Sequence, residues 1–261
     1  MKSILIVNDD GIDSPGIRAA AEAVRHLGDV TVVAPSTQQS GVGRSLSLRR
    51  PLAVKKAGLE GFNAYSVDGT PVDSVIVGIF GLMRKTPDLL ISGINLGENM
   101  SREITTSGTV CAAIEGANHG IPSVAISLHL DSEARLDPGR KADLRFSKKT
   151  LASVSKAILE RGLPEGVDLL NINIPDSDAE GGIKITTLAH RMYSARVHRL
   201  DAPSGGSSYY IDGDAIFDAE PGTDVYAVRV ERCVSITPLT LDLTARSDME
   251  DIGQRLLQHL F

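Results

Sequence analysis

Two adjacent carboxylates, Asp9 and Asp10, stand one residue after the first apolar run of the chain and just before Gly11. Successive side chains of a strand point to opposite faces, so both carboxylates can reach one ion only where the chain leaves strand geometry. Gly11 permits such a turn. Because Mg²⁺ and Mn²⁺ prefer oxygen ligands, the pair predicts a site for a hard divalent cation. A solvated turn, or a cap for the helix that follows, is the alternative.

A second polar stretch, residues 36–45, contains Ser40, Gly41 and Arg44 and follows another apolar run. It lacks the Lys-Ser/Thr pair of the Walker loop, and it also differs from the dinucleotide fingerprint. Its hydroxyls, its backbone amides and the Arg44 guanidinium could still contact a phosphate. The stretch is therefore either part of a phosphate site or a flexible surface loop.

Two further clusters, residues 92–99 and 106–109, carry neutral groups that suit a cation or a phosphate. The side-chain oxygen of an Asn such as Asn95 binds a hard cation without adding charge, which leaves the metal electrophilic. Ser107 and Thr109, at the start of a predicted helix, offer hydroxyls together with unpaired N–H groups and the positive end of the helix dipole. Ser107 is also suited to cap that helix with no ligand present.

The elements that must position these loops alternate along the first part of the chain. Apolar runs predict strands over residues 4–7, 30–34, 88–92, 123–127 and 169–174. Amphipathic segments predict helices over residues 15–27, 71–84, 109–119 and 146–161. This alternation indicates an α/β fold, a doubly wound core with a mostly parallel sheet. Ligands bind such sheets at the carboxyl ends of the strands, so the polar loops are expected on one edge.

The pattern changes after residue 180. Short strand-like runs separated by Gly, Pro and Asp extend over residues 183–240, and a helix is predicted over residues 247–260. We therefore predict a Rossmann-like catalytic core over residues 1–180. Residues 181–261 are predicted to form a β-rich C-terminal extension that ends in a helix and serves in self-association.

Composition and charge exclude several functions. The 261 residues carry 27 Lys and Arg against 33 Asp and Glu, a formal net charge of -6 at pH 7, so a broad surface for nucleic acid polymers is not expected. The longest apolar stretch, residues 75–83, is shorter than the roughly 20 residues of a spanning helix. The two cysteines cannot make a disulfide framework. We expect a cytoplasmic protein without membrane contact.

Taken together, these loops resemble the SurE family, survival proteins that act as metal-dependent nucleoside monophosphate phosphatases. The resemblance spans most of the chain and rests on ordered motifs: Val7–Gly11 with Ser14–Ile17, Val33–Pro35 with Gln39–Gly41, Gly69–Pro71 with Asp73, Ser92–Asn95 with Gly97 and Asn99, Ser107–Val110, Ile121–Pro122 with Ala125–Ser127, Asn171–Pro175, and Thr223–Val225 with Ser235–Leu239. Two places depart from the family pattern, Thr106 and the pair Arg232 and Cys233. The first concerns nucleotide preference, and the second concerns the C-terminal extension.

The resemblance implies an activity and a role for individual residues. It implies hydrolysis of nucleoside 5′-monophosphates, with 3′-monophosphates and short polyphosphate as further candidate substrates. One Mg²⁺ or Mn²⁺ per subunit would be held by Asp9, Asp10, Ser40 and Asn95, and the two carboxylates would also be catalytic. The phosphate pocket would be lined by Asn8, Gly41, Asn99, Ser107, Gly108 and Thr109. A C-terminal segment exchanged between subunits would give a homodimer or a homotetramer.

The predicted mechanism is attack on phosphorus by a metal-activated water. A phosphoaspartyl intermediate is less consistent with the sequence, because the phosphatases that form one space their carboxylates as Asp-x-Asp. Two alternatives stay open. A nucleotide-binding regulatory protein would keep the pocket without turnover, and an enzyme for phosphoesters other than nucleotides would differ only at the pocket rim.

Overall fold

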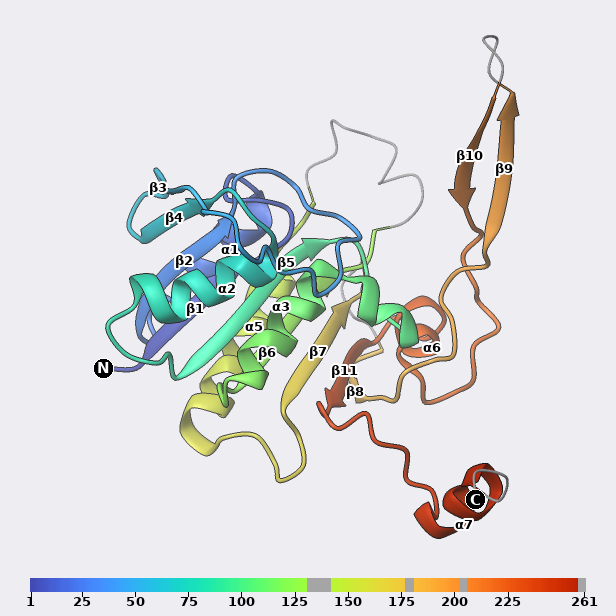
Figure 1. Ribbon diagram of the computed structural model, residues 1–261. Helices are drawn as coiled ribbons and strands as arrows, with labels where there is room; N and C mark the ends of the chain where they lie inside the picture. Colours follow the sequence, from blue (N-terminus) through green and yellow to red (C-terminus); the bar gives the residue numbers. More distant parts are fainter. Residues whose placement is uncertain (131–141, 177–180, 202–205, 258–261) are drawn as a thin grey trace.

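The fold is given by a computed structural model that describes residues 1–130, 142–176, 181–201 and 206–257. Within these residues nine strands form one sheet, in the order β3-β4-β2-β1-β5-β6-β7-β11-β8, and two more form a separate hairpin (Figure 1). The strands of the large sheet are β1 (Ser3–Val7), β2 (Asp29–Pro35), β3 (Val54–Lys56), β4 (Asn63–Val67), β5 (Leu89–Leu96), β6 (Ser123–Leu128), β7 (Leu169–Ile174), β8 (Ile183–Ile185) and β11 (Val234–Leu239).

The centre of this sheet is parallel and buried on both faces. Strands β4, β2, β1, β5, β6 and β7 run parallel, whereas β3 and β11 run antiparallel to their inner neighbours. In β1, Ile4 and Ile6 pack into the apolar cluster on one face, and Leu5 and Val7 pack into the cluster on the other. Continuous apolar strands of this kind require cover on both sides. The predicted fold class is confirmed.

Helices supply that cover (Figure 1). One face carries α1 (Pro15–Val24) and α5 (Arg145–Arg161), and the other carries α2 (Pro71–Val77) and α3 (Gly108–Asn118). The helix predicted over residues 71–84 ends early, because the α-helix stops at Val77 and a π-helical turn continues over Gly78–Leu82. Two glycines in that turn are poor helix formers.

The C-terminal extension is only partly separate from the core. Strands β8 and β11 add to the sheet beside β7, whereas β9 (Arg196–Asp201) and β10 (Ser207–Asp212) form a hairpin that projects from the body of the molecule (Figure 1). A short helix that was not predicted, α6 (Asp224–Arg229), lies among the strand-like runs, and α7 (Met249–Leu257) lies within the predicted terminal helix. The predicted boundary at residue 180 falls outside the described residues.

In the part of the chain that the structure describes, no helix has both the length and the apolar character that crossing a membrane requires.

The substitution Gly16→Ala is expected to lower the free energy of unfolding by about 2 kcal/mol or more. The start of α1 packs so closely on β5 that a Cβ at this position would collide with the carbonyl oxygen of Ile94, and forcing extra atoms into packed structure costs about 1–3 kcal/mol. Urea unfolding followed by circular dichroism measures the change. Gly58→Ala is the matched control, because its Cβ would meet nothing within 4 Å. Equal stability of the two variants would contradict this account of the packing.

Candidate active site

The turn after β1 is shaped by Asn8, which is fully buried. Its amide nitrogen donates to the Gly11 carbonyl (3.0 Å) and to the Ser14 hydroxyl (2.9 Å), and its oxygen accepts from the Gly11 N–H (3.2 Å). Gly11 has a φ of +96°, which glycine adopts readily. The chain therefore leaves strand geometry at the predicted point, and Asn8 holds the turn that presents Asp9 and Asp10.

The Asp9 side chain is buried against the start of α3. The Thr109 hydroxyl donates to Asp9 Oδ1, and a Cβ on Gly108 would lie only 2.8 Å from the Asp9 Cβ. Burial raises the pKa of Asp9 above its ordinary value, and hydrogen bonds from the side chain and backbone of Thr109 oppose that rise. Two residues predicted for the phosphate pocket therefore touch a predicted metal ligand.

Asp10 links the same turn to two other loops. Its Oδ2 accepts from the backbone N–H of Leu96, at the end of β5 (3.3 Å). The Gln38 side-chain nitrogen lies 3.5 Å from Asp10 Oδ1 and donates to the Ser40 hydroxyl (3.1 Å). Burial, followed by the charge of Asp9, raises the pKa of Asp10 to about 6. The charge of Asp9 thus disfavours ionisation of Asp10, which a bound cation would relieve.

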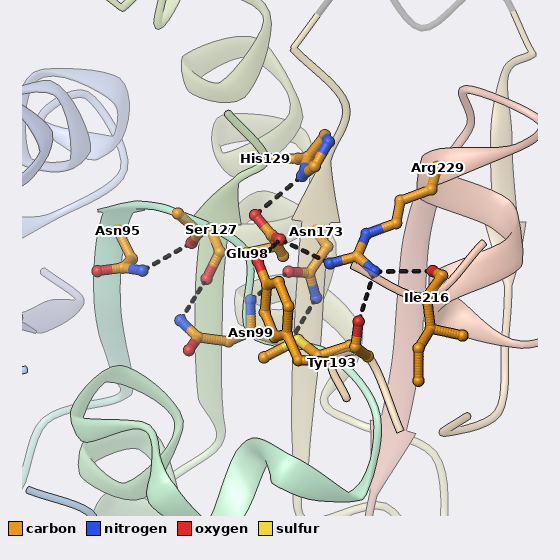
Figure 2. Close-up of polar contacts among 11 residues, drawn as sticks. Asn95, Glu98, Asn99, Ser127, His129, Asn173, Tyr193, Ile216 and Arg229 are labelled. Atoms are coloured by element: carbon orange, nitrogen blue, oxygen red, sulfur yellow. Dashed lines mark hydrogen bonds and ion pairs between the residues drawn. The ribbon is translucent and has the colours of Figure 1, made fainter. Parts of the chain in front are cut away.

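Asn95 lies where the pairing of β5 with β6 shifts register. Its side-chain nitrogen donates to the Gly97 carbonyl (2.6 Å). A carbonyl only accepts, so the Asn95 oxygen must point the other way, and Figure 2 shows it on the side away from Ser127. The oxygen is therefore the atom that Asn95 offers to a ligand.

Asn99 is anchored by side chains of β6 and β7 (Figure 2). Its side-chain nitrogen donates to the Ser127 hydroxyl (2.9 Å), and its backbone N–H donates to the Asn173 side-chain oxygen (2.9 Å). Asn171 and Asn173 both donate to the Asn99 carbonyl, each over 2.8 Å. The structure thus fixes the backbone at Asn99, while its place in a phosphate pocket stays a prediction.

The loop that contains Ser40 and Gly41 is held between β1 and the segment before α3. The Gln39 N–H donates to the Asp9 carbonyl (2.7 Å), and the Gly43 N–H donates to the Thr106 carbonyl (3.0 Å). Thr106 ends the 3₁₀-helix η2 (Arg102–Thr106), which leads directly into α3. The loop therefore packs against the other predicted site segments.

Comparisons with known proteins agree with these motifs. The family model described as "Survival protein SurE" matches residues 4–195. The chain belongs to the SurE family. The relative named 5′-nucleotidase SurE from Methanocella arvoryzae is 50% identical over 93% of each chain. The relative of the same name from Archaeoglobus fulgidus is 48% identical, over 95% of this chain and 94% of that one. The crystal structure of the SurE protein from Aquifex aeolicus has a TM-score of 0.82 at 41% identity, covering 97% of this chain and 99% of that chain.

The predicted ligands of this SurE chain form a donor set that fits a hard cation. Asp9 and Asp10 offer carboxylate oxygens, Ser40 offers a hydroxyl and Asn95 offers a neutral carbonyl oxygen. Within the described residues, no three His, Cys, Asp or Glu side chains come together as a metal site. The predicted set contains only two such side chains, Asp9 and Asp10, and takes its other ligands from Ser40 and Asn95. A search for three His, Cys, Asp or Glu side chains therefore does not test it. The burial of two neighbouring carboxylates is the observation that favours a cation here.

Several contacts at this edge of the sheet were not predicted from the sequence. Arg44 was considered as a phosphate contact, but its Nε donates to Glu115 on α3 (2.8 Å). Gln38 bridges Asp10 and Ser40, and only its position beside Ser40 hints at that contact. Glu98 lies inside a predicted cluster, yet its partner Arg229 is 131 positions away and no spacing rule connects them.

Proposed function

We propose that this protein hydrolyses nucleoside 5′-monophosphates to a nucleoside and phosphate, with one Mg²⁺ or Mn²⁺ per subunit. The observation that carries the proposal is the meeting of Asp9 and Asp10 with the start of α3 and the loop of Ser40. Nucleotides bind doubly wound sheets at this carboxyl edge. The relatives that are 50% and 48% identical carry the name 5′-nucleotidase, which supports the same activity.

The arrangement suits transfer of a phosphoryl group to water. A divalent ion held by Asp9, Asp10, Ser40 and Asn95 would neutralise phosphoryl oxygens and lower the pKa of a bound water. Asp10 is less buried than Asp9, so it is the carboxylate placed to accept or donate a proton. The first turn of the 11-residue helix α3 carries the positive end of its dipole and would stabilise the phosphoryl oxygens of a substrate bound beside it. Ser107 keeps that turn in place by accepting the Val110 N–H (3.1 Å).

We also propose that the protein forms a homodimer or homotetramer through its C-terminal extension. The β9–β10 hairpin exposes large apolar side chains on both strands, among them Val197, Leu200, Tyr209, Tyr210 and Ile211. Apolar side chains gathered on one exposed element are typical of a protein interface. No nucleic acid polymer and no membrane is proposed as a partner.

We place the enzyme in the cytoplasm. Cys111 and Cys233 are both buried and free, as is usual for proteins of reducing compartments.

The proposal is tested by measuring phosphate release in the presence of Mg²⁺, Mn²⁺ or a chelator. The substrates are a panel of 5′- and 3′-nucleotides, short polyphosphate and a phosphoester other than a nucleotide. We expect turnover of 5′-monophosphates that requires the divalent ion and falls strongly in Asn95→Ala. Undiminished turnover in the chelator would overturn the metal assignment. Nucleotide-dependent protection from thermal unfolding, without phosphate release at any metal concentration, would identify a regulatory protein.

A further inference from the structure

The segment that runs from Asn95, near the end of β5, through Ser101 is called the site loop, and a buried ion pair joins it to the C-terminal extension. Glu98 lies on this loop and Arg229 lies at the end of α6, and each side chain is only 1% exposed. Nη2 of Arg229 lies 2.9 Å from Oε1 of Glu98. Two charges removed from water are stable only when their geometry is good and further hydrogen bonds satisfy them.

Further hydrogen bonds hold the carboxylate end of the pair. Glu98 Oε1 also accepts from the Tyr193 hydroxyl (2.6 Å), and Glu98 Oε2 lies 2.8 Å from Nδ1 of His129. Figure 2 shows Glu98 between His129 and the guanidinium of Arg229, beside the strand ends that hold Asn99. The carboxylate therefore has a single defined position.

The guanidinium end of the pair is fixed by the base of the β9–β10 hairpin. Nη1 of Arg229 donates to the carbonyls of Met192 (2.6 Å) and Ile216 (2.8 Å), which lie on either side of the hairpin in the sequence. The guanidinium also lies 4.9 Å from the centre of the Tyr193 ring. Arg229 thus connects the site loop to both segments that lead into the hairpin.

A second contact joins α6 to the same loop on the other side of Asn99. Asp224 Oδ2 accepts from the Ser101 N–H (2.7 Å), and Asp224 Oδ1 accepts from the Ala189 N–H (2.9 Å). The loop is therefore attached to α6 at Glu98 and again at Ser101.

We propose that Glu98 and Arg229 are positioning residues for the hydrolysis, an inference that rests on the proposed function. The pair holds the loop so that the Asn95 oxygen and Asn99 stay in register with the turn of Asp9 and Asp10. Displacement of such a group by about 1 Å lowers turnover by about a hundredfold. The extension therefore acts in catalysis as well as in the proposed self-association.

The test compares Arg229→Met with the double variant Glu98→Gln/Arg229→Met in the full-length protein. Arg229→Met leaves the buried Glu98 carboxylate without its arginine partner, so both the melting temperature and kcat are expected to fall. The double variant removes that charge and is expected to regain most of the melting temperature. Its kcat is expected to stay at least about tenfold low with a smaller change in KM. Its affinity for Mn²⁺ without substrate, measured by electron paramagnetic resonance of the free ion, is expected to be about tenfold weaker.

Thr186→Val is the matched control within the extension. It removes a buried hydroxyl that bonds to Ser235 (2.7 Å) and Thr237 (2.8 Å) and leaves the site loop untouched. We expect a lower melting temperature with unchanged kcat and Mn²⁺ affinity. An equal loss of kcat in this control would overturn the positioning role, because turnover would then follow stability alone.

Recovery of wild-type kcat and Mn²⁺ affinity in the double variant would overturn the proposal as well, since the pair would then serve only stability. Absence of phosphate release from every nucleotide in the wild-type protein would refute the proposed function. The Mn²⁺ measurement would still decide whether the pair positions the loop.

Discussion

Asp9→Asn is expected to lower phosphate release from nucleoside 5′-monophosphates by about a thousandfold, the loss typical when one fixed polar contact is removed from a reaction centre. Asn has nearly the same shape as Asp, and its oxygen can still accept the Thr109 hydroxyl. The variant should therefore fold normally, and it lacks only the negative charge that would hold the cation. A malachite-green assay with Mn²⁺ at saturating substrate measures the loss.

The same substitution is expected to raise the melting temperature of the metal-free protein at pH 7. Burial raises the pKa of Asp9 above its ordinary value of 3.8. A carboxyl group with a raised pKa binds its proton more tightly in the folded chain than in the unfolded chain. The folded state therefore loses stability as the pH rises from about 3.8 to the raised pKa, and the loss is complete above it. The neutral Asn removes this penalty.

Asp13→Asn provides the control for both measurements. Asp13 is exposed and stands four positions after Asp9, so neither turnover nor the melting temperature in chelator should change. Turnover at the wild-type rate in Asp9→Asn would exclude Asp9 from the reaction. A lower melting temperature in chelator would show that the Asp9 charge has a favourable partner in the metal-free fold.

The turn that carries Asp9 and Asp10 could be predicted because its signals are local. The apolar residues of β1 are followed at once by Asn8, Asp9 and Asp10, and parallel strands gather such turns on one edge. The start of α3 was equally readable. Ser107 caps α3, as predicted, whereas α1 is capped by Ser14 and not by the Asp9 and Asp10 pair that the sequence offered as an alternative.

Other parts of the fold left no local signal. Helix α6 has six residues, fewer than two turns, so its apolar period cannot be told from that of a short strand. Strand β3 has three exposed residues and shows no alternation of apolar and polar side chains. The Glu98–Arg229 pair depends on the way α6 packs on the sheet edge, which a spacing rule does not encode.

The contact between Gly108 and Asp9 was also not predicted from the sequence. It supports a second prediction, of a large effect on kcat. Gly108→Ala is expected to lower kcat by about a hundredfold, because a displacement of about 1 Å at a reaction centre has an effect of that order. The added Cβ would lie 2.8 Å from the Asp9 Cβ and 2.9 Å from its Oδ2. Asp9 or the first turn of α3 must then move, and both belong to the proposed site.

Stability and activity should separate in this variant, which makes the test specific. The three atoms nearest to the added Cβ all belong to the Asp9 side chain, so a small movement of that side chain relieves the collision. We expect a small change in melting temperature beside the large loss in kcat and a weaker affinity for Mn²⁺. Gly81→Ala, on the same face of the sheet, is the control, because its Cβ would come no closer than 3.9 Å to Val77. Wild-type kcat in Gly108→Ala would mean that the position of Asp9 against α3 does not matter for turnover. The contact between Asp9 and the start of α3 would then have no part in the proposed site.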